Sequence, residues 1–175
     1  MGLMPGSVRR TRRVAATGVR SMAGRSKAGR SKAGRSKGML KVGAVVFGLA
    51  LVVSSCVSAD QTRVFNQVNN SRASSGIAVM AQNGWMSDFA QRWAEHMAAT
   101  CTLAHSPDFV TANPYNWRGL AENVGSGPSL STVHTAFMNS AGHRANILNP
   151  RFNYLGTGVA RGCDRYWVVH EFMQL

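Results

Sequence analysis

The chain has 175 residues and a formal net charge of +13, but this charge is concentrated at one end. Residues 1–56 hold twelve of the 20 lysines and arginines and no acidic residue, whereas the other eight are balanced by all seven acidic residues. The part after residue 56 therefore has a net charge of only +1. A nucleic-acid-binding domain needs a basic stripe on its folded part, and none is visible in this sequence.

Residues 1–38 form a basic leader of low complexity. Ala-Gly-Arg-Ser-Lys occurs three times between residues 23 and 37, and such a composition does not bury a core. One interpretation is a basic tail that stays in the cytoplasm or binds nucleic acid. The other, which we favour, is that translation starts at Met39, because the leader then has ordinary signal-peptide proportions.

Residues 39–56 are typical of a signal peptide. Lys41 precedes an apolar run of 12 residues, Val42 to Val53, and small residues follow it. A membrane-spanning helix needs about 20 apolar residues, so this run favours export with cleavage over a permanent anchor.

Two cleavage sites compete at the end of this run. Residues 53–56, Val-Ser-Ser-Cys, are similar to a bacterial lipobox, in which the cysteine becomes the lipidated first residue. Residues 57–59, Val-Ser-Ala, are an alternative site for ordinary signal peptidase. We favour lipidation of Cys56, since two acyl chains give stable membrane attachment. Either site predicts an extracytoplasmic protein, a cell-surface lipoprotein or a secreted one.

With Cys56 assigned to the lipobox, Cys101 and Cys163 remain. A pair of cysteines in an oxidising compartment predicts a disulfide bond between them. The alternative is two buried free thiols.

Apolar residues three and four apart predict three helices in the remaining domain, residues 60–175. The first begins at Asp60 as a cap and runs to about Arg72, the second covers residues 86–101, and the third covers residues 129–139. Between the second and third, residues 102–118 predict a loop, because Pro107 and Pro114 interrupt it.

The end of the chain changes to strand character. Leu155–Ala160 and Tyr166–Phe172 are rich in glycine, aromatic and β-branched residues, and Arg161–Asp164 predicts a hairpin turn between them. The fold class is therefore mixed α+β, with helices around a small, mainly antiparallel sheet.

Three segments place polar residues beside small ones: Leu103–Ser106, Ala121–Gly125 and Ser140–Pro150. In this order, and followed by Leu155–Ala160 and Tyr166–Val169, they resemble the bacterial branch of the CAP superfamily. This superfamily includes cysteine-rich secretory proteins, antigen 5 and pathogenesis-related class 1 proteins, and its domain is also called SCP. The resemblance covers about Thr62 to Phe172.

The resemblance implies an α-β-α sandwich with a central cleft, where two histidines and an acid converge. By residue match these are His105, His143 and Glu122. Two features depart from the family pattern: Asn139-Ser140 stands where many relatives have a second acid, and Phe137 replaces a tryptophan.

Two neutral imidazoles, His105 and His143, can ligate a divalent ion such as zinc, with Glu122 as a third ligand, an orienting group or a base. Two ligands alone make a weak site, because catalytic zinc normally has three protein ligands. The alternative is a hydrogen-bonded network of the same residues that holds loops together.

Other notable residues receive simpler interpretations. His96 is expected on the surface and His134 at a helix edge, while Arg144 and Asn146 are expected to bind backbone near Gly142. Trp93 and Trp167 are expected in the core. His170 and Glu171 either reach the cleft or face solvent, and we favour solvent.

We therefore expect an exported module that binds a lipid, a small molecule or an extracellular protein, rather than an enzyme. The alternative is a metal-assisted, peptidase-like hydrolase in which Glu122 activates water. Against it, the motifs pair no serine or cysteine nucleophile with a base, and no HExxH sequence is present. Nucleic-acid binding rests on the leader alone, which export removes.

Overall fold

A computed structural model describes residues 3–9 and 57–175. The repeats, the apolar run and Cys56 lie outside the described residues, so the expectations for start site, cleavage and lipidation stay predictions. Within the described part of the chain, no helix has the length and apolar character needed to cross a membrane.

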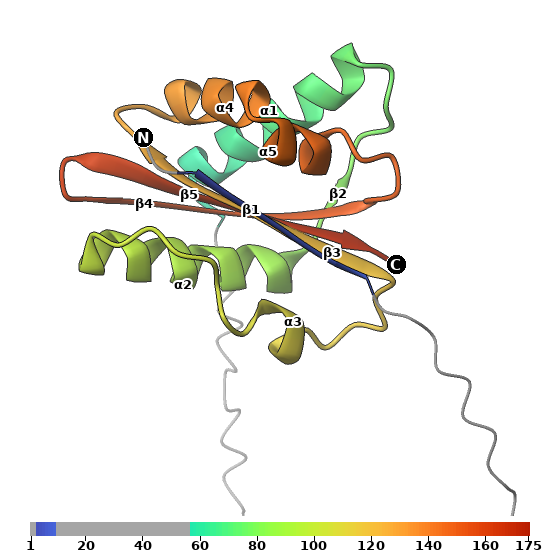
Figure 1. Ribbon diagram of the computed structural model, residues 1–175, viewed down its shortest axis with the longest axis horizontal. Coiled ribbons are helices and arrows are strands. Elements are labelled where there is room, and N and C mark those ends of the chain that lie inside the picture. The colour runs from blue at the N-terminus through green and yellow to red at the C-terminus, as the bar shows by residue number, and fades with distance from the viewer. Residues whose placement is uncertain (1–2, 10–56) are drawn as a thin grey trace, which may run out of the picture. The chain divides into compact units, whose positions relative to one another are not determined.

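The helices form two layers on either side of one sheet (Figure 1). One layer holds α1 (Ala59–Ser74), α4 (Leu130–Asn139) and α5 (Ala141–Ile147). The other holds α2 (Gly84–Thr100) and α3 (Phe109–Ala112). This arrangement is an α-β-α sandwich, as the resemblance to the CAP superfamily implied.

The sheet has the strand order β1-β3-β5-β4-β2 in the described residues. Its strands are β1 (Leu3–Arg9), β2 (Ala81–Gln82), β3 (Gly119–Gly127), β4 (Tyr154–Gly162) and β5 (Arg165–Gln174). All neighbours pair antiparallel except β2 and β4, which are parallel. The prediction of a mainly antiparallel sheet is confirmed, but only β4 and β5 were expected as strands; β1, β2 and β3 were not.

The helix starts are fixed by short polar side chains. The hydroxyl of Ser58 accepts from the Gln61 amide at 3.1 Å, and the Gln61 side chain accepts from the Ser58 amide at 2.8 Å. Asp60, which we expected to cap α1, lies instead in its first turn. Asn83 caps α2 through the Met86 amide at 3.0 Å.

Helix α2 packs directly on the backbone of β4. A Cβ atom added to Gly158 would lie 2.1 Å from the carbonyl carbon of Ala90, and one added to Gly156 would lie 2.4 Å from that of Met86. The glycines therefore set the distance between this helix and the sheet. Helix α2 and strand β5 also share an apolar cluster, which includes Met97 and the predicted core residue Trp167.

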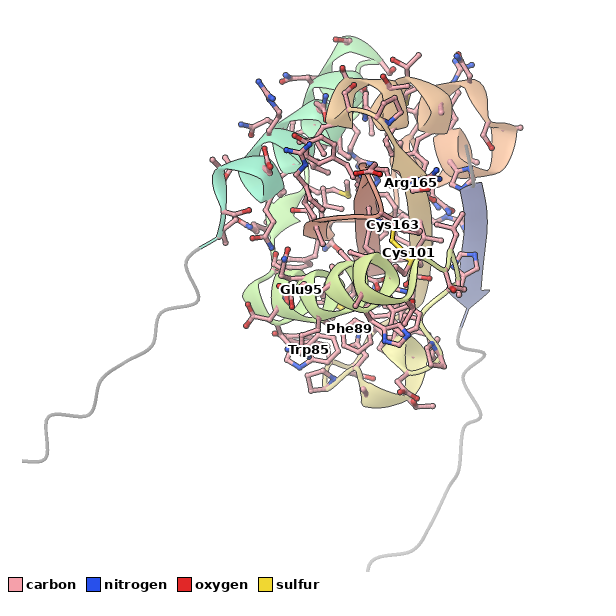
Figure 2. The ribbon with its side chains drawn as sticks, turned by 90° about the vertical axis from the view of Figure 1, so that its left-hand side faces the viewer. Trp85, Phe89, Glu95, Cys101, Cys163 and Arg165 are labelled. Carbon is pink, nitrogen blue, oxygen red and sulfur yellow. A yellow bond between two sulfur atoms is a disulfide. The ribbon has the colours of Figure 1, made fainter. Side chains whose placement is uncertain are left out.

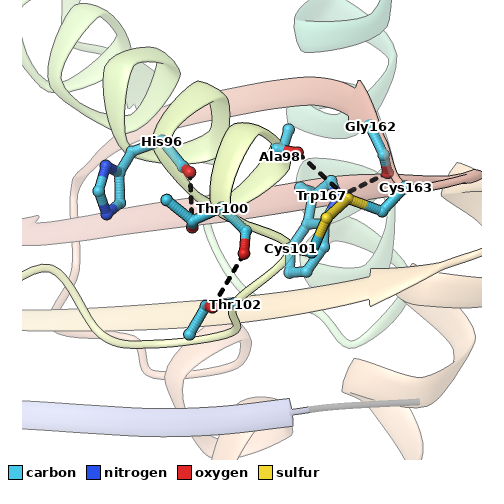
Figure 3. Close-up of a disulfide and its surroundings, with 8 residues drawn as sticks. All are labelled: His96, Ala98, Thr100, Cys101, Thr102, Gly162, Cys163 and Trp167. Carbon is cyan, nitrogen blue, oxygen red and sulfur yellow. Dashed lines mark hydrogen bonds between the residues drawn. A yellow bond between two sulfur atoms is a disulfide. The ribbon is translucent and has the colours of Figure 1, made fainter.

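A disulfide joins the end of α2 to the β4–β5 hairpin (Figures 2 and 3). Cys101 and Cys163 have Cα atoms 6.0 Å apart, so the predicted pairing is confirmed. The hairpin turn is the two residues Cys163 and Asp164, both with positive φ, 53° and 57°. The Trp167 indole lies beside the disulfide and donates to the Gly162 carbonyl at 2.9 Å.

Arg72 is a buried charge that ties the end of α1 to two other segments. Its guanidinium donates to the carbonyls of Ala78, Ile147, Asn149 and Phe152 at 2.8 to 3.0 Å. Burial lowers the pKa of Arg72 from its ordinary value. The four carbonyl dipoles compensate the charge in place of a carboxylate.

Candidate functional site

His105 and Glu122 are brought together from the 102–118 loop and from β3. The imidazole Nδ1 of His105 contacts Oε1 of Glu122, and the Ser106 amide donates to both carboxylate oxygens at 3.1 and 3.3 Å. Glu122 is thereby held by two neighbouring residues of the loop. The His105 side chain remains 33% exposed, so the pair is reachable from solvent.

A pocket of about 150 Å³ opens beside this pair. Its walls come from β1, the 105–110 segment and β3, and its lining is mostly apolar. The lining residues are Gly6, Ser7, His105, Ser106, Phe109, Val110, Leu120, Ala121 and Glu122. Ser106 also orders this wall, because its hydroxyl accepts from the Phe109 amide at 3.2 Å.

Glu171 lies on the same side of the sheet as Glu122, directly opposite it in the β3–β5 register. Our expectation that Glu171 faces solvent is wrong, because its exposed fraction is 0%. Neither carboxylate oxygen accepts from a donor in the described part of the chain, so Glu171 can form a hydrogen bond with Glu122 only as its protonated acid. Burial, and then the negative charge of Glu122, raise the pKa of Glu171 well above its ordinary value. We call His105, Glu122 and Glu171 the carboxylate cluster.

The sequence carried a signal for Glu171 that we did not use. Trp167 and Val169 point toward α2, and every second residue of a strand shares a face. Glu171 is next in that series and so belongs to the buried face.

His143 lies in the other layer, on α5, and is 1% exposed. Its Nδ1 is 2.7 Å from the Ser140 hydroxyl, and its ring centre is 5.0 Å from that of Phe137. The side-chain amide nitrogen of Asn123 donates to the His143 backbone carbonyl at 3.1 Å. The side-chain amide nitrogen of Asn146 donates to the side-chain oxygen of Asn123 at 2.9 Å. Asn146 therefore connects α5 to β3 through a side chain, whereas we had expected it to bind backbone.

His170 also lies in this layer, where we had expected solvent exposure. It is 1% exposed, and its ring centre is 4.8 Å from that of Phe137. Burial lowers its pKa well below the ordinary value, and the positive charges of His134 and His143 lower it further. We call His143 and His170, with Phe137 between them, the imidazole cluster.

The two remaining histidines match their predicted places. His134 is half-buried on α4 with its Nε2 2.9 Å from the Ser71 hydroxyl. His96 is exposed on α2 and stacks on Trp93. Trp93, expected in the core, is only half-buried. Its indole donates to the carbonyl of Ala104, in the 102–118 loop, at 2.9 Å.

The cleft expected to unite His105, Glu122 and His143 is thus divided between two layers. Glu122 and Asn123 are consecutive in β3, so their side chains point to opposite faces of the sheet. His105 contacts Glu122 on one face, and the His143 backbone accepts from Asn123 on the other.

This division bears on the predicted zinc site. Among residues 3–9 and 57–175, no three His, Cys, Asp or Glu side chains are grouped as metal ligands. The Nδ1 of His105 is engaged by Glu122 and that of His143 by Ser140. This arrangement does not fit a three-ligand zinc centre, and we derive no chemistry through a metal.

Comparison with protein families places this fold and these motifs. Residues 65–172, more than half of the chain, match the model of the cysteine-rich secretory protein family, CAP. The chain therefore belongs to the CAP family, and the resemblance drawn from its motifs is confirmed.

Individual relatives agree with this assignment. YkwD, an uncharacterized protein of Bacillus subtilis (strain 168), is 30% identical over 112 residues, which are 59% of this chain and 44% of YkwD. The chain thus spans less than half of the length of that curated relative.

Two solved structures share the fold. An outer surface protein of Borrelia burgdorferi has a TM-score of 0.60 at 16% identity, covering 66% of this chain and 92% of that one. An extracellular SCP-domain protein of Bacillus anthracis str. Ames has a TM-score of 0.57 at 22% identity, covering 66% and 40%.

Proposed function

We propose that the protein is an exported CAP-domain binding module whose ligand site is the pocket beside His105 and Glu122. The observation that carries this proposal is the contrast between the two clusters. His105 is one-third exposed and lines a pocket, whereas His143 and His170 are each 1% exposed. A ligand therefore reaches His105 and Glu122 through the pocket without unfolding of the domain.

Export is supported by two independent features. A disulfide between Cys101 and Cys163 is typical of proteins in oxidising compartments. The fold is shared with an outer surface protein and an extracellular protein of two bacteria. Together with the signal-peptide pattern of residues 39–56, these features favour a location outside the cytoplasm, anchored through Cys56 or released after Ala59.

A metal-assisted hydrolase is the second candidate, and the geometry favours it less. Its mechanism needs the two histidines to share an ion, but His105 and His143 lie in different layers and are each bound to another side chain. The carboxylate cluster does offer an acid with a raised pKa, but it has no paired nucleophile among its three members.

The compartment is tested by purifying the protein from its own cells and measuring its mature N-terminus and intact mass. A lipid-bearing Cys56 in the membrane fraction, or a start at Asp60 in the medium, supports export. A protein that retains its full leader contradicts it.

The site is tested by an NMR screen of small-molecule fragments on the full chain. We expect shifts at His105, Phe109 and Glu122, and loss of binding in His105→Ala. His96→Ala is the matched control, because His96 is an exposed histidine away from this pocket's lining. Fragments that bind equally to His105→Ala, or that shift only other regions, contradict the site.

A further inference from the structure

The edge of the sheet beside the carboxylate cluster is occupied by the chain's own first residues. Strand β1 pairs antiparallel with β3 over seven residues, from Leu3 opposite Gly125 to Arg9 opposite Gly119. Gly6 lies opposite Glu122. Without β1, β3 is an edge strand of the described sheet and presents a row of unpaired backbone groups.

Strand β1 also lies against the candidate site. A Cβ atom added to Gly6 would lie 3.4 Å from Cε1 of His105, and Gly6 and Ser7 form one wall of the pocket. Helix α5, which carries His143, packs on β1 from the other layer (Figure 1). Strand β1 thus contacts the carboxylate cluster on one face of the sheet and α5, the helix of His143, on the other.

All nine residues of β3 are buried while β1 is in place. Residues 3–9 precede the predicted signal peptide, so the predicted cleavage, or a start at Met39, removes β1 from the mature domain. The mature protein then exposes a long, largely unbroken edge next to His105 and Glu122. Native proteins rarely leave such an edge uncovered.

We propose that this edge of the mature domain binds an extended peptide segment of an extracellular partner protein, antiparallel to β3 over residues 119–125. The inference rests on the proposed function and names the class of its ligand. Strand addition supplies affinity through backbone hydrogen bonds and specificity through pockets for alternate side chains. Here, the residue opposite Glu122 sits beside the pocket lined by His105.

The size of the pocket favours a peptide over a larger ligand. With a strand in the position of β1, whose Gly6 and Ser7 form one wall, the pocket measures about 150 Å³, which is the volume of a cavity that accepts benzene and hence of one side chain. Pockets for drug-sized molecules are roughly 300 to 1,000 Å³. A peptide needs only a side-chain pocket because its backbone makes most of the contact with β3.

The test uses the full chain with a specific protease site inserted between residues 23 and 37. After the cut, β1 stays bound by contacts alone and exchanges with an added fluorescent peptide of the sequence of residues 3–9. We expect saturable binding by fluorescence anisotropy in the cut chain and at least tenfold weaker binding in the uncut chain, because tethered β1 competes.

Two N-methylated peptides are matched controls for strand pairing. Pro5 has no amide hydrogen, so it fits an edge strand when its nitrogen faces away from β3. The backbone amides of Leu3, Ser7 and Arg9 point in the same direction as that nitrogen, because they alternate with those of Met4, Gly6 and Val8. N-methylation at Met4, Gly6 and Val8 is therefore expected to weaken binding at least about tenfold. N-methylation at Leu3, Ser7 and Arg9 is expected to leave it within about threefold. Equal binding of the two peptides overturns the proposal.

Hydrogen exchange supplies a second measurement that does not depend on the inserted site. In the natural full chain, amides of residues 119–125 should be protected, and an excess of the unmodified peptide should restore that protection in the cut chain. No peptide binding and no restored protection overturn the proposal. These results are independent of the mature N-terminus, so a failure of peptide binding is distinguishable from a failure of the export proposal.

Discussion

Glu122 and Glu171 face each other across β3 and β5, and only one of the two carboxylates has compensating partners. Glu122 is held by His105 and by the Ser106 amide, whereas Glu171 is fully buried, accepts from no donor among the described residues, and can form a hydrogen bond with Glu122 only as its protonated acid. Two adjacent carboxyl groups in such a place do not both ionise readily. The pair is therefore expected to hold a proton on Glu171 while Glu122 accepts from the histidine loop.

The first prediction concerns Glu171→Gln. Because the pKa of Glu171 is raised in the folded protein, the unfolded chain releases this proton first as the pH rises. The native protein should lose stability above the unfolded pKa of about 4.3, by up to ~1.4 kcal/mol per pH unit, until the folded carboxyl also ionises. The Gln variant should lack this loss and be more stable at pH 7. Urea unfolding between pH 4 and 8 measures it.

Glu95→Gln is the matched control for this prediction. Glu95 lies on α2, exposed, with a hydrogen bond from Gln91 (Figure 2). Its substitution should leave the pH profile of unfolding unchanged. A Glu171→Gln profile that parallels the native one would show that Glu171 ionises normally in the fold.

The second prediction concerns His170. Its pKa is lowered by burial and by the charges of His134 and His143, so the unfolded chain takes up a proton that the folded chain does not. Stability should therefore be complete above the unfolded pKa of about 6.5 and fall as the pH drops below it. His170→Gln should reduce the loss between pH 6.5 and 5. Denaturant unfolding at pH 7.5 and 5.5 measures this loss of stability. His96→Gln is the control, because His96 is exposed.

The third prediction concerns Arg72→Met. The substitution keeps a long side chain but leaves the four carbonyls that Arg72 binds without their donor. Each unsatisfied buried group costs about 1–3 kcal/mol, partly relieved by water, so we expect a loss of about 3 kcal/mol or more. Arg63→Met, at an exposed position on the same helix, should change stability by less than about 0.5 kcal/mol. Equal effects of the two substitutions would contradict the role given to Arg72.

The fourth prediction concerns Gly158→Ala. The added methyl group would lie 2.1 Å from the Ala90 backbone, so α2 must move away from β4. Overpacking of this kind costs typically 1–3 kcal/mol, and the contact here is with backbone rather than with a flexible side chain. Thermal unfolding should show a lower Tm. Gly84→Ala, where no atom lies within 4 Å of the added Cβ, should leave the Tm unchanged or raise it.

Local patterns predicted α1, α2, α4 and the β4–β5 hairpin between residues 59 and 175, but not β2, α3 or β3. The apolar spacing in α2, the turn at Cys163 and Asp164 and the disulfide each depend on residues close in sequence or on a simple count of cysteines. The helix starts were less accurate, because Ser58 rather than Asp60 caps α1. Several polar side chains compete for such positions, and their sequence preferences are similar.

The candidate site was predicted only in part. His105 and Glu122 do meet, but His143 lies on the opposite face of the sheet, where it contacts Asn123, the residue after Glu122. The resemblance to a family indicates which residues matter, but it does not give their side of the sheet. Period-2 alternation in β3 decides that side. Applied to β5, it puts His170 and Glu171 on opposite faces, and both are buried because helices cover both faces of the sheet.

Strand β1 could not be predicted because nothing local marks it as a strand. It contains Pro5 and Gly6, residues that weaken strand propensity, and its partner β3 lies more than a hundred residues later. Its pairing depends on an edge that the rest of the fold creates.

The disulfide has a consequence for the response of the domain to proteases. The 102–118 loop carries His105 and α3, and it lies between Cys101 and Cys163 in sequence. A protease that cuts this loop therefore produces two fragments that are still covalently joined. The β5 strand, with Glu171, then stays attached to α2 across the cut, and reducing and non-reducing gels of the digested protein should differ in the number of bands.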